Sequence, residues 1–200
     1  TPAGGNAVRT WSTDNARAYL DEAQRLGLMV MMGLWVQHER HGFDYDNEAK
    51  VKMQLDNFRK VVMELKDHPA LLLWGVGNEV DLFYSNTKVW KAVNDIAKMI
   101  HEIDPHHPTT TVTAGLDPEE VKCIMKDAPE IDIYSVNTYG GIGDVRANLR
   151  NYGWKGPYLI TEWGPNGHWE VGKTSWGSPI EQTSSEKAKS YRERYLGEIE

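Results

Sequence analysis

Two glutamates stand at the ends of strongly apolar segments of the sequence. Glu79 closes "LLLWGVGNE" and Glu162 closes "YLITE". A buried carboxylate is costly unless it is paired or used, so two of them at such positions predict a chemical role. Two carboxyl groups that share one cavity can protonate a leaving oxygen and attack a carbon, which is the chemistry of glycosidic bond cleavage. We therefore expect Glu79 and Glu162 to be catalytic.

Other polar and aromatic residues follow the ends of similar apolar segments. The general acid of such a pair must stay protonated near neutral pH, which burial and a neighbouring anion favour. The nucleophile must stay ionised, which we expect Arg9 and the Tyr139 hydroxyl to favour. Tryptophan faces can pack on a sugar ring while their N–H groups bond its hydroxyls, and Trp11, Trp169 and Trp176 offer such faces. The expected substrate-binding residues are Arg9, Trp35, His38, His41, Asn78, Asn137, Tyr139 and Trp163.

The segments that must position these residues alternate between strand and helix patterns. Apolar positions repeat every three or four residues in 51–65 and 90–103, which is typical of an amphipathic helix. Further helices are expected at 12–27 with Ser12 or Thr13 as N-cap, at 118–125, at 145–152, and at 183–196 with Thr183 and Glu186 in a capping box. Apolar or β-branched strands are expected near 6–11, 28–36, 70–76, 109–113, 131–137 and 158–161.

These strands and helices favour one architecture. Strands that are apolar on both faces and are each followed by a helix indicate a parallel sheet covered by helices, so the fold class is α/β. A TIM (β/α)₈ barrel needs eight strands in about 250 residues, so six strands predict a barrel that lacks one unit at each end. A doubly wound sheet is the alternative, but "NAVRTWSTDN" lacks the Gly-rich loop it favours. We expect residues 1–200 to form one incomplete catalytic-barrel segment, with two strands outside the chain.

A barrel would bring the candidate residues together. The carboxyl ends of its strands form the mouth that holds the chemistry. Glu79 and Glu162 end strands that are three units apart, and such strands face each other across a closed barrel. Glycosidases that retain the anomeric configuration place their two carboxyl groups about 5–5.5 Å apart. The spacing therefore predicts that Glu79 and Glu162 face each other across the mouth.

Composition and charge exclude several other classes of function. The formal net charge of -7 lacks the basic field that binding to nucleic acid or an anionic membrane needs. The longest apolar stretch, 28–36, is shorter than the roughly 20 residues of a membrane span. Cys123 is the single cysteine, which excludes an internal disulfide. His38, Glu39 and His41 lack the spacing of a further metal ligand, so we expect no metal and no other cofactor.

Several other residues are assigned structural roles. Trp74 lies inside an expected strand and Trp90 on a helix stripe, so both are expected in the core. Glu170 and Glu181 follow the last strand, where surface acids are the default interpretation. The cellular compartment stays open, because the first residues carry no signal leader but resemble the interior of a fold.

The sequence resembles the clan A glycoside hydrolases, which are retaining (β/α)₈ enzymes, and most of all the catalytic barrel of glycoside hydrolase family 2. "GGNAVRTW" resembles that family's second strand, "ERHG" a turn after the third, and "PALLLWGVGNEV" the fourth with its Asn-Glu pair. "IDPHHPTTTV", "IDIYSVNTYGG" and "PYLITEWGP" are similar to strands five, six and seven. Family 5 or a related clan member is the alternative, because the β-sandwich domains that accompany many family 2 enzymes are not seen here.

The resemblance implies that the six expected strands are strands two to seven of the barrel. It implies that Glu79 is the acid/base, that Glu162 is the nucleophile and that Asn78 is the partner of the sugar 2-hydroxyl. It further implies that Arg9 and Tyr139 support the nucleophile, and that His41 contacts the substrate. Substrate residues on strands one and eight would lie outside this chain.

Three functions are consistent with this pattern. The first is a retaining β-glycoside hydrolase that acts on β-linked oligo- or polysaccharides by double displacement. The second is a transglycosylase that uses the same carboxylates with a sugar hydroxyl as acceptor. The third is a catalytically silent carbohydrate-binding barrel, which the presence of both carboxylates disfavours. The expected partners are a carbohydrate substrate, the remaining barrel strands and accessory domains of a longer chain, with neither nucleic acid nor a membrane.

Overall fold

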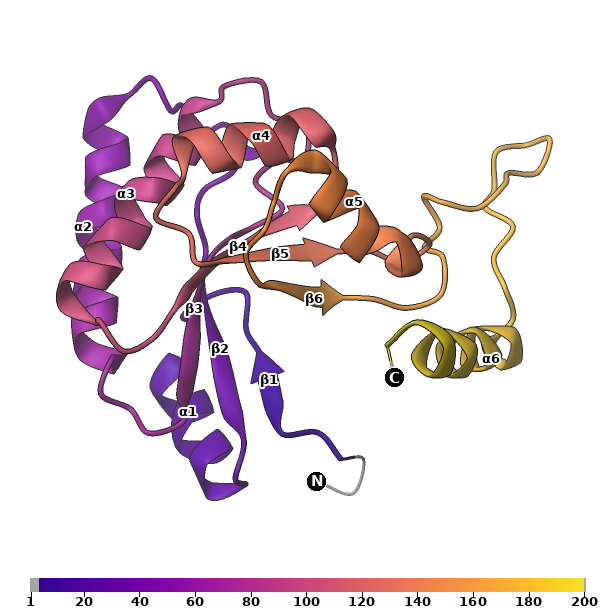
Figure 1. Cartoon of the computed structure of the whole chain (residues 1–200), viewed down its shortest axis with the longest axis horizontal. Coiled ribbons are helices and arrows are strands. Elements are labelled where there is room, and N and C mark those ends of the chain that lie inside the picture. The colour runs from indigo at the N-terminus through magenta and orange to yellow at the C-terminus, as the bar shows by residue number, and fades with distance from the viewer. Residues whose placement is uncertain (1–3, 200) are drawn as a thin grey trace.

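The computed structural model describes residues 4–199 as an alternation of strands and helices (Figure 1). Each expected strand and helix is present in the expected order, with some shifted ends. The strands are β1 (Ala7–Arg9), β2 (Met29–Leu34), β3 (Leu71–Asn78), β4 (Thr109–Ala114), β5 (Ile133–Asn137) and β6 (Tyr158–Glu162). The helices are α1 (Ala16–Arg25), α2 (Glu48–Leu65), α3 (Lys88–Ile103), α4 (Pro118–Asp127), α5 (Val145–Tyr152) and α6 (Ser184–Arg194). Short 3₁₀ turns lie at Glu39–His41 and Ile142–Asp144, and a π-helical turn, Tyr195–Ile199, follows α6.

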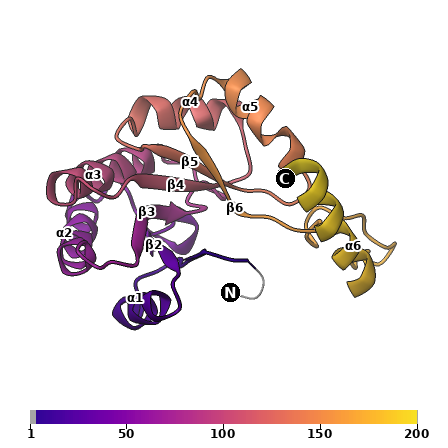
Figure 2. The same cartoon turned by 60° about the horizontal axis from the view of Figure 1, so that its bottom comes forward.

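The described strands form one parallel sheet of six strands in the order of the chain, from β1 to β6. The sheet curves into an arc, and α1 to α5 lie on its outer side (Figure 2). Parallel pairing places the carboxyl ends of the strands at the same edge of this arc. The predicted α/β class and barrel architecture are confirmed, with six of the eight strands that a TIM barrel contains.

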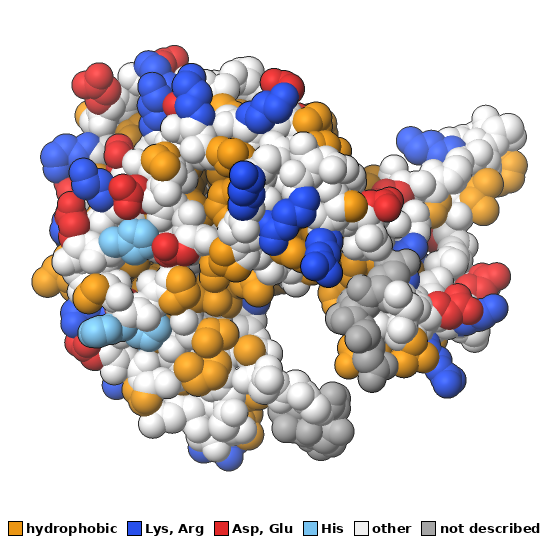
Figure 3. Space-filling view, in the orientation of Figure 1, with side chains coloured by type: hydrophobic (Ala, Val, Ile, Leu, Met, Phe, Trp, Pro, Cys, Tyr) orange, Lys and Arg blue, Asp and Glu red, His pale blue; other side chains and the backbone are white. Residues whose placement is uncertain are grey.

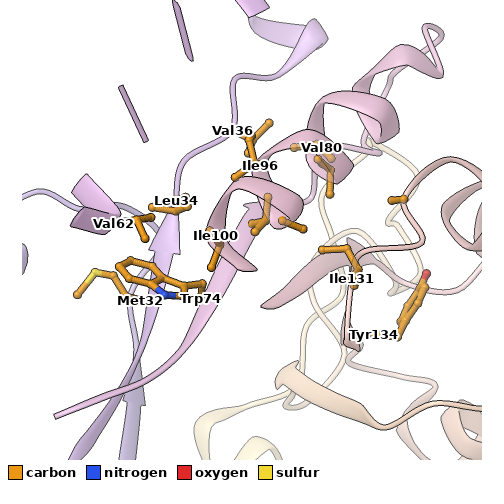
Figure 4. Packing of buried hydrophobic residues seen from close by; sticks show 14 of the residues in the cluster. Met32, Leu34, Val36, Val62, Trp74, Val80, Ile96, Ile100, Ile131 and Tyr134 are labelled. Carbon is orange, nitrogen blue, oxygen red and sulfur yellow. The ribbon is translucent and has the colours of Figure 1, made fainter. Parts of the chain in front are cut away.

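The main hydrophobic core lies between the sheet and its outer helices (Figure 4). Met32 and Leu34 of β2 and Trp74 of β3 are fully buried there against α2 and α3. The Trp74 indole donates to Asp104 Oδ2 at 2.8 Å, and the fully buried Trp90 donates to the Tyr84 hydroxyl at 3.2 Å. Both tryptophans therefore have the predicted core role, with their polar N–H groups satisfied.

A second, smaller cluster covers the inner face of the arc. It consists of Met31, Leu73 and Val112, with Leu159 packed against it. Gly33 on β2 allows β1 to approach closely, because a Cβ atom at this position would lie 2.3 Å from the carbonyl oxygen of Thr10. The inner face is thus filled by side chains, as in the packed interior of a TIM barrel.

Two helix starts test the capping predictions. The expected N-cap at Ser12 or Thr13 is wrong, because α1 begins after Asn15, which adopts a left-handed conformation with φ 54°. The Ser12 hydroxyl instead bonds the Asp14 carboxylate at 2.8 Å. The capping box of Thr183 and Glu186 is confirmed at the start of α6. None of the helices within residues 4–199 combines the length and apolar character that crossing a membrane requires.

The segment after β6 carries α6 away from the main body. The space-filling view shows an open notch between that body and the part of the chain around α6 (Figure 3). β1 and β6 are the two edges of the sheet and lie on this open side of the arc (Figure 1). The helix is tied back near the end of β6, where Tyr191 packs edge-on against Trp163 at 5.4 Å.

Candidate active site

Polar side chains from four strands meet at the carboxyl edge of the sheet. Arg9 and Asn78 are the last residues of β1 and β3, and Asn137 and Glu162 are the last residues of β5 and β6. Glu79 follows β3 directly. Because β3 runs to Asn78, two residues beyond the predicted end, the strand itself positions the Asn-Glu pair. The topology therefore gathers residues up to 153 positions apart in sequence.

Arg9 connects the two sides of this cluster. Its Nη1 donates to Glu162 Oε1 at 3.0 Å, and its Nη2 donates to Asn78 Oδ1 at 2.5 Å. Nη1 also lies 3.4 Å from Asn137 Oδ1. Burial lowers the pKa of Arg9, while the carboxylates of Glu162 and Glu79 act in the opposite direction and favour the guanidinium. A cation is thereby fixed within the electrostatic reach of both glutamates.

The Glu162 carboxylate accepts hydrogen bonds from three described side chains. Arg9 and the Trp11 indole each donate to Oε1 at 3.0 Å. The Tyr139 hydroxyl donates to Oε2 at 2.9 Å. Burial and this hydrogen bond to Glu162 raise the pKa of Tyr139 to about 12, so the phenol stays a donor across the physiological range. Donors on both oxygens hold the carboxylate in one orientation.

The Glu79 side chain accepts one side-chain hydrogen bond among the described residues, from Asn137 Nδ2 to Oε1 at 2.8 Å. Its backbone is held firmly, since its N–H donates to the Val112 carbonyl at 2.8 Å and its carbonyl accepts from Arg40 at 3.1 Å. Glu79 adopts φ 51°, a left-handed conformation that is uncommon for a residue with a Cβ. Strain of this kind persists where the surroundings over-determine it, and it is common at active sites.

Asn137 and Asn78 link the two carboxylates. Asn137 donates to Glu79, and its Oδ1 accepts from the Thr161 hydroxyl at 2.8 Å and faces Arg9. Asn78 Oδ1 is occupied by Arg9 and by Asn137 Nδ2, the latter at 3.3 Å. The carbonyl end of the Asn78 amide is therefore directed at the protein, which leaves its NH₂ group as the end that can donate to a ligand.

The remaining residues expected to bind substrate lie outside this network of hydrogen bonds. His38 is fully buried, and its Nε2 lies 2.6 Å from the Asn78 carbonyl, so it supports the end of β3. Trp35 packs on the His38 ring at 4.7 Å and lines a groove of about 400 Å³ beside α2. His41 is exposed and contacts the other edge of His38 at 5.0 Å, while Trp163 packs on α6.

Sequence reasoning missed several members of the network. Trp11 was expected only as a flat face for a sugar, yet it donates to Glu162. Arg194 of α6 donates to the Tyr139 carbonyl at 2.6 Å and to Asn166 Oδ1 at 2.6 Å, and it also bonds the Gly164 carbonyl. Arg40 was not singled out because it lies in a loop. The strand-end positions of Trp11 and Thr161 gave a usable signal.

Glu39, which the sequence places between two histidines, has a structural role. It accepts from the backbone N–H groups of Ser85 and Asn86 at 2.8 and 2.9 Å and from the Ser85 hydroxyl at 2.6 Å. These bonds tie the loop after β2 to the loop before α3. Within residues 4–199, no three His, Cys, Asp or Glu side chains gather as they would around a metal ion.

A cleft of about 440 Å³ opens beside Glu79. Its floor is formed by the ends of β4 and β5, and its walls come from the loop after β3 and the loop after β6. The lining residues are Glu79, Leu82, Phe83, Ala114, Gly115, Asn137, Thr138, Tyr139, Trp169 and Glu170. Glu170, which was expected to be an ordinary surface acid, thus lies at the cleft and accepts from the Gly140 N–H at 3.3 Å.

Two further carboxyl groups lie behind Glu79. Asp81 accepts from the Ala114 N–H at 2.8 Å through one oxygen, and its other oxygen is buried without a partner among the described residues. Burial raises the pKa of Asp81 to about 6, and the charge of Glu79 adds to this effect. Glu120 of α4 has a similarly unpartnered oxygen, and burial together with the charge of Asp81 raises its pKa to about 8. Asp81 thus places a second carboxyl group near Glu79, and Glu120 lies near Asp81.

The model of the family "Glycosyl hydrolases family 2, TIM barrel domain" matches residues 3–196, nearly the whole chain. The chain belongs to this family. The resemblance stated from the sequence motifs is confirmed, and β1 to β6 are strands of a family 2 barrel.

Two curated relatives illustrate the likeness. The chain is 29% identical over 173 residues to a β-galactosidase of Thermoanaerobacterium thermosulfurigenes, a match that covers 82% of this chain and 20% of the relative. It is 26% identical over 141 residues to the β-glucuronidase of Chlorocebus aethiops, which covers 68% of this chain and 20% of the relative. The chain thus spans about a fifth of the length of these relatives.

Solved structures of family 2 proteins share the fold. A β-D-glucuronidase from Dictyoglomus thermophilum superposes with a TM-score of 0.68 at 18% identity, covering 98% of this chain and 36% of that one. A β-galacturonidase from Eisenbergiella tayi superposes with a TM-score of 0.67 at 18% identity, covering 96% and 34%. At this identity the likeness establishes the architecture of the barrel.

Proposed function

We propose that this chain supplies the catalytic centre of a retaining β-glycoside hydrolase, with Glu162 as nucleophile and Glu79 as acid/base. One observation carries the proposal: both carboxylates belong to the same Arg9–Asn137 network at the mouth of a family 2 barrel. A pair of carboxyl groups in one network, with different surroundings, is what double displacement requires.

In the first half of the reaction, a Glu162 oxygen attacks the anomeric carbon and forms a glycosyl ester. The bond to the leaving oxygen breaks as Glu79 transfers its proton to that oxygen. Arg9, Trp11 and Tyr139 orient the Glu162 carboxylate through the bonds described above. The attack therefore starts from a fixed geometry, which lowers its entropic cost.

In the second half, the Glu79 carboxylate takes a proton from water as the water oxygen attacks the anomeric carbon. The ester bond breaks, Glu162 leaves as a carboxylate and Glu79 is protonated again. Two inversions give net retention of the anomeric configuration. The free NH₂ group of Asn78 donates to the sugar 2-hydroxyl, a contact that strengthens in the transition state of such reactions.

The substrate class follows from the relatives. Those named above are a β-galactosidase and a β-glucuronidase, so we propose a β-galactoside or a β-glucuronide as the substrate. The open edges at β1 and β6 support the further proposal that two more strands complete the barrel and contribute to the sugar site.

The test uses the full-length protein with p-nitrophenyl β-D-galactoside and β-D-glucuronide, and follows the first-formed sugar by proton NMR. The expected product is the β-anomer, before it equilibrates in solution. A first-formed α-anomer would contradict the retaining mechanism, and absence of hydrolysis with tight sugar binding would favour the silent barrel instead. Products extended by an added sugar acceptor, in place of free sugar, would favour the transglycosylase.

A further inference from the structure

We infer that the cleft beside Glu79 is the leaving-group subsite, that it takes a flat, apolar aglycone, and that Phe83 is its platform. The inference rests on the proposed function, because only an acid/base role for Glu79 places the leaving group on its side of the sugar. It goes further by naming the chemical class of the group that the sugar is attached to.

Phe83 is the most conspicuous side chain of this cleft. It is 86% exposed, although the loop that carries it is well anchored. Val80 is buried on one side, and the Asp81 carboxylate accepts from the Ala114 N–H. On the other side, Glu39 binds the N–H groups of Ser85 and Asn86. A large apolar side chain held out in water by a firmly tied loop indicates a binding surface.

The backbone of this loop is also strained. Phe83 adopts φ 55°, and Glu79, four positions earlier, adopts φ 51°. Within residues 4–199, Asn15 is the remaining non-glycine residue with positive φ, so two of these three conformations flank one cleft. Bulky residues rarely adopt this conformation, and it clusters at ligand-binding sites. The Phe83 ring is exposed at the cleft and does not pack into the core.

The opposite wall of the cleft offers a second ring. Trp169 lies edge-on to Tyr139 at 5.2 Å and is itself largely exposed. Glu170 holds this wall in place, since its carboxylate accepts from the N–H groups of Gly140 and Gly167 at 3.3 and 3.2 Å. Gly140 permits the approach, because a Cβ atom there would lie 2.9 Å from Asn166 Nδ2.

The cleft lies on the side of Glu79 where the leaving group would depart. The proton of Glu79 goes to the oxygen that leaves, so the group attached to that oxygen extends from Glu79 into this cleft. Leu82, Phe83 and Trp169 present apolar surface there, and Tyr139 both lines the cleft and donates to Glu162. Aromatic rings favour flat apolar partners over small hydrated ones. A phenyl-like aglycone therefore fits better than a methyl group.

The experiment measures binding of two hydrolysis-resistant probes, phenyl and methyl 1-thio-β-D-galactopyranoside, to the full-length protein by calorimetry. The glucuronide counterparts are used if the protein hydrolyses glucuronides. The quantity of interest is the ratio of the two dissociation constants, in which contacts to the sugar cancel. We expect Phe83→Ala to reduce the preference for phenyl by about 10-fold, in line with the strength of ring packing.

Tyr19→Ala is the matched control, because Tyr19 is a 57% exposed ring on the outer helix α1. This control is expected to leave the ratio unchanged. Trp169→Ala is an independent variant on the other wall of the cleft. We expect it to reduce the preference for phenyl by less than Phe83→Ala does, and it tests the subsite if Phe83→Ala does not fold. An unchanged ratio in the folded variants would overturn the subsite. If Glu162→Ala abolishes hydrolysis at the same time, the proposed function stands while the subsite alone fails.

Discussion

The two glutamates of the site are held in different ways. Glu162 accepts from Arg9, Trp11 and Tyr139, whereas the Glu79 side chain accepts from Asn137 alone among the described residues. Glu162 forms an ion pair with Arg9 at 3.0 Å, while the carboxyl group of Asp81 lies near Glu79 and that of Glu120 lies near Asp81. Glu162 is therefore held by several donors, whereas Glu79 has few side-chain contacts and lines an open cleft.

This difference shows how one fold can give different roles to two glutamates. Carboxyl groups can take different roles when their surroundings differ. Glu162 is held by donors on both oxygens, whereas Glu79 has one side-chain donor among the described residues and lines the cleft. The contrast also has a mechanical side, because the strained loop after β3 carries Glu79 and the exposed Phe83, while Glu162 lies within β6.

The largest expected effect comes from removing the Glu162 carboxylate. We expect Glu162→Ala to lower kcat by roughly 10⁴-fold or more, for every leaving group, because the nucleophile is needed whichever group departs. Steady-state rates with alkyl, p-nitrophenyl and dinitrophenyl glycosides measure this. Glu181→Ala, at a surface acid in the segment after β6, is the control and should retain full activity. Turnover of Glu162→Ala within about 10-fold of the parent would refute the assignment.

Removal of the other carboxylate should give a different pattern. Glu79→Ala is expected to lower kcat/KM by about 10²–10⁴-fold for an alkyl glycoside, because general acid catalysis is worth that much when the leaving oxygen is basic. A dinitrophenyl leaving group needs no proton, so its first step should be slowed far less. The ratio of the two losses is the measurement. Equal losses for both substrates would show that Glu79 is not the acid.

Arg9 tests the contrast between the two glutamates, because it forms an ion pair with Glu162. We expect Arg9→Met to reduce kcat/KM by about 10²–10³-fold, as is typical for loss of one preorganised donor. The variant removes the charged donor to Glu162 Oε1 and to Asn78 Oδ1, so both glutamates lose part of their support. Arg17→Met on α1, where the arginine is exposed, is the matched control. An unchanged kcat/KM in a folded Arg9→Met protein would exclude the network from catalysis.

The smallest expected effect concerns Glu120, the half-buried carboxyl group near Asp81. The pKa of Glu120 is raised in the folded state to about 8, whereas a carboxyl in the unfolded chain ionises near its ordinary value. The unfolded state therefore releases its proton first, and the native state loses stability as the pH rises from about 4.5 to about 8. Glu120→Gln removes this loss.

We expect Glu120→Gln to raise the Tm by a few °C at pH 8 and to change it little at pH 5, which corresponds to about 1–2 kcal/mol at the higher pH. Thermal unfolding followed by tryptophan fluorescence at several pH values measures the trend. Glu119→Gln, at the exposed neighbouring position on α4, is the control and should show no such dependence on pH. A gain in Tm that is the same at both pH values would contradict the electrostatic cause.

Much of the fold could be predicted because the patterns behind it are local. The stripe of Val62 and its neighbours marks α2, and the capping box of Thr183 marks the start of α6. The N-cap prediction for α1 was wrong because the Ser12 hydroxyl bonds Asp14 and does not cap the helix. The end of β3 was predicted too early, because Asn78 is a strand residue only through its pairing with β4.

The candidate site was predictable in part for a similar reason. Polar residues that end apolar strands are visible in sequence, and parallel pairing brings such ends to one edge. The sequence does not show which of these strand-end residues contact one another. His38 and Trp35 follow a strand as Arg9 does, yet they lie beneath and beside the strand ends, outside the network that joins the carboxylates.

The sequence by itself determined the order of strands and helices and the family of the barrel, because residue periodicity and short motifs encode both. Only the tertiary structure decided that Arg9 bridges Glu162 and Asn78, that Asn137 reaches Glu79, and that Phe83 is held out at a cleft. Hydrogen bonds depend on tenths of an ångström between groups from distant segments, and sheet register and loop strain set those distances. No local pattern contains that information.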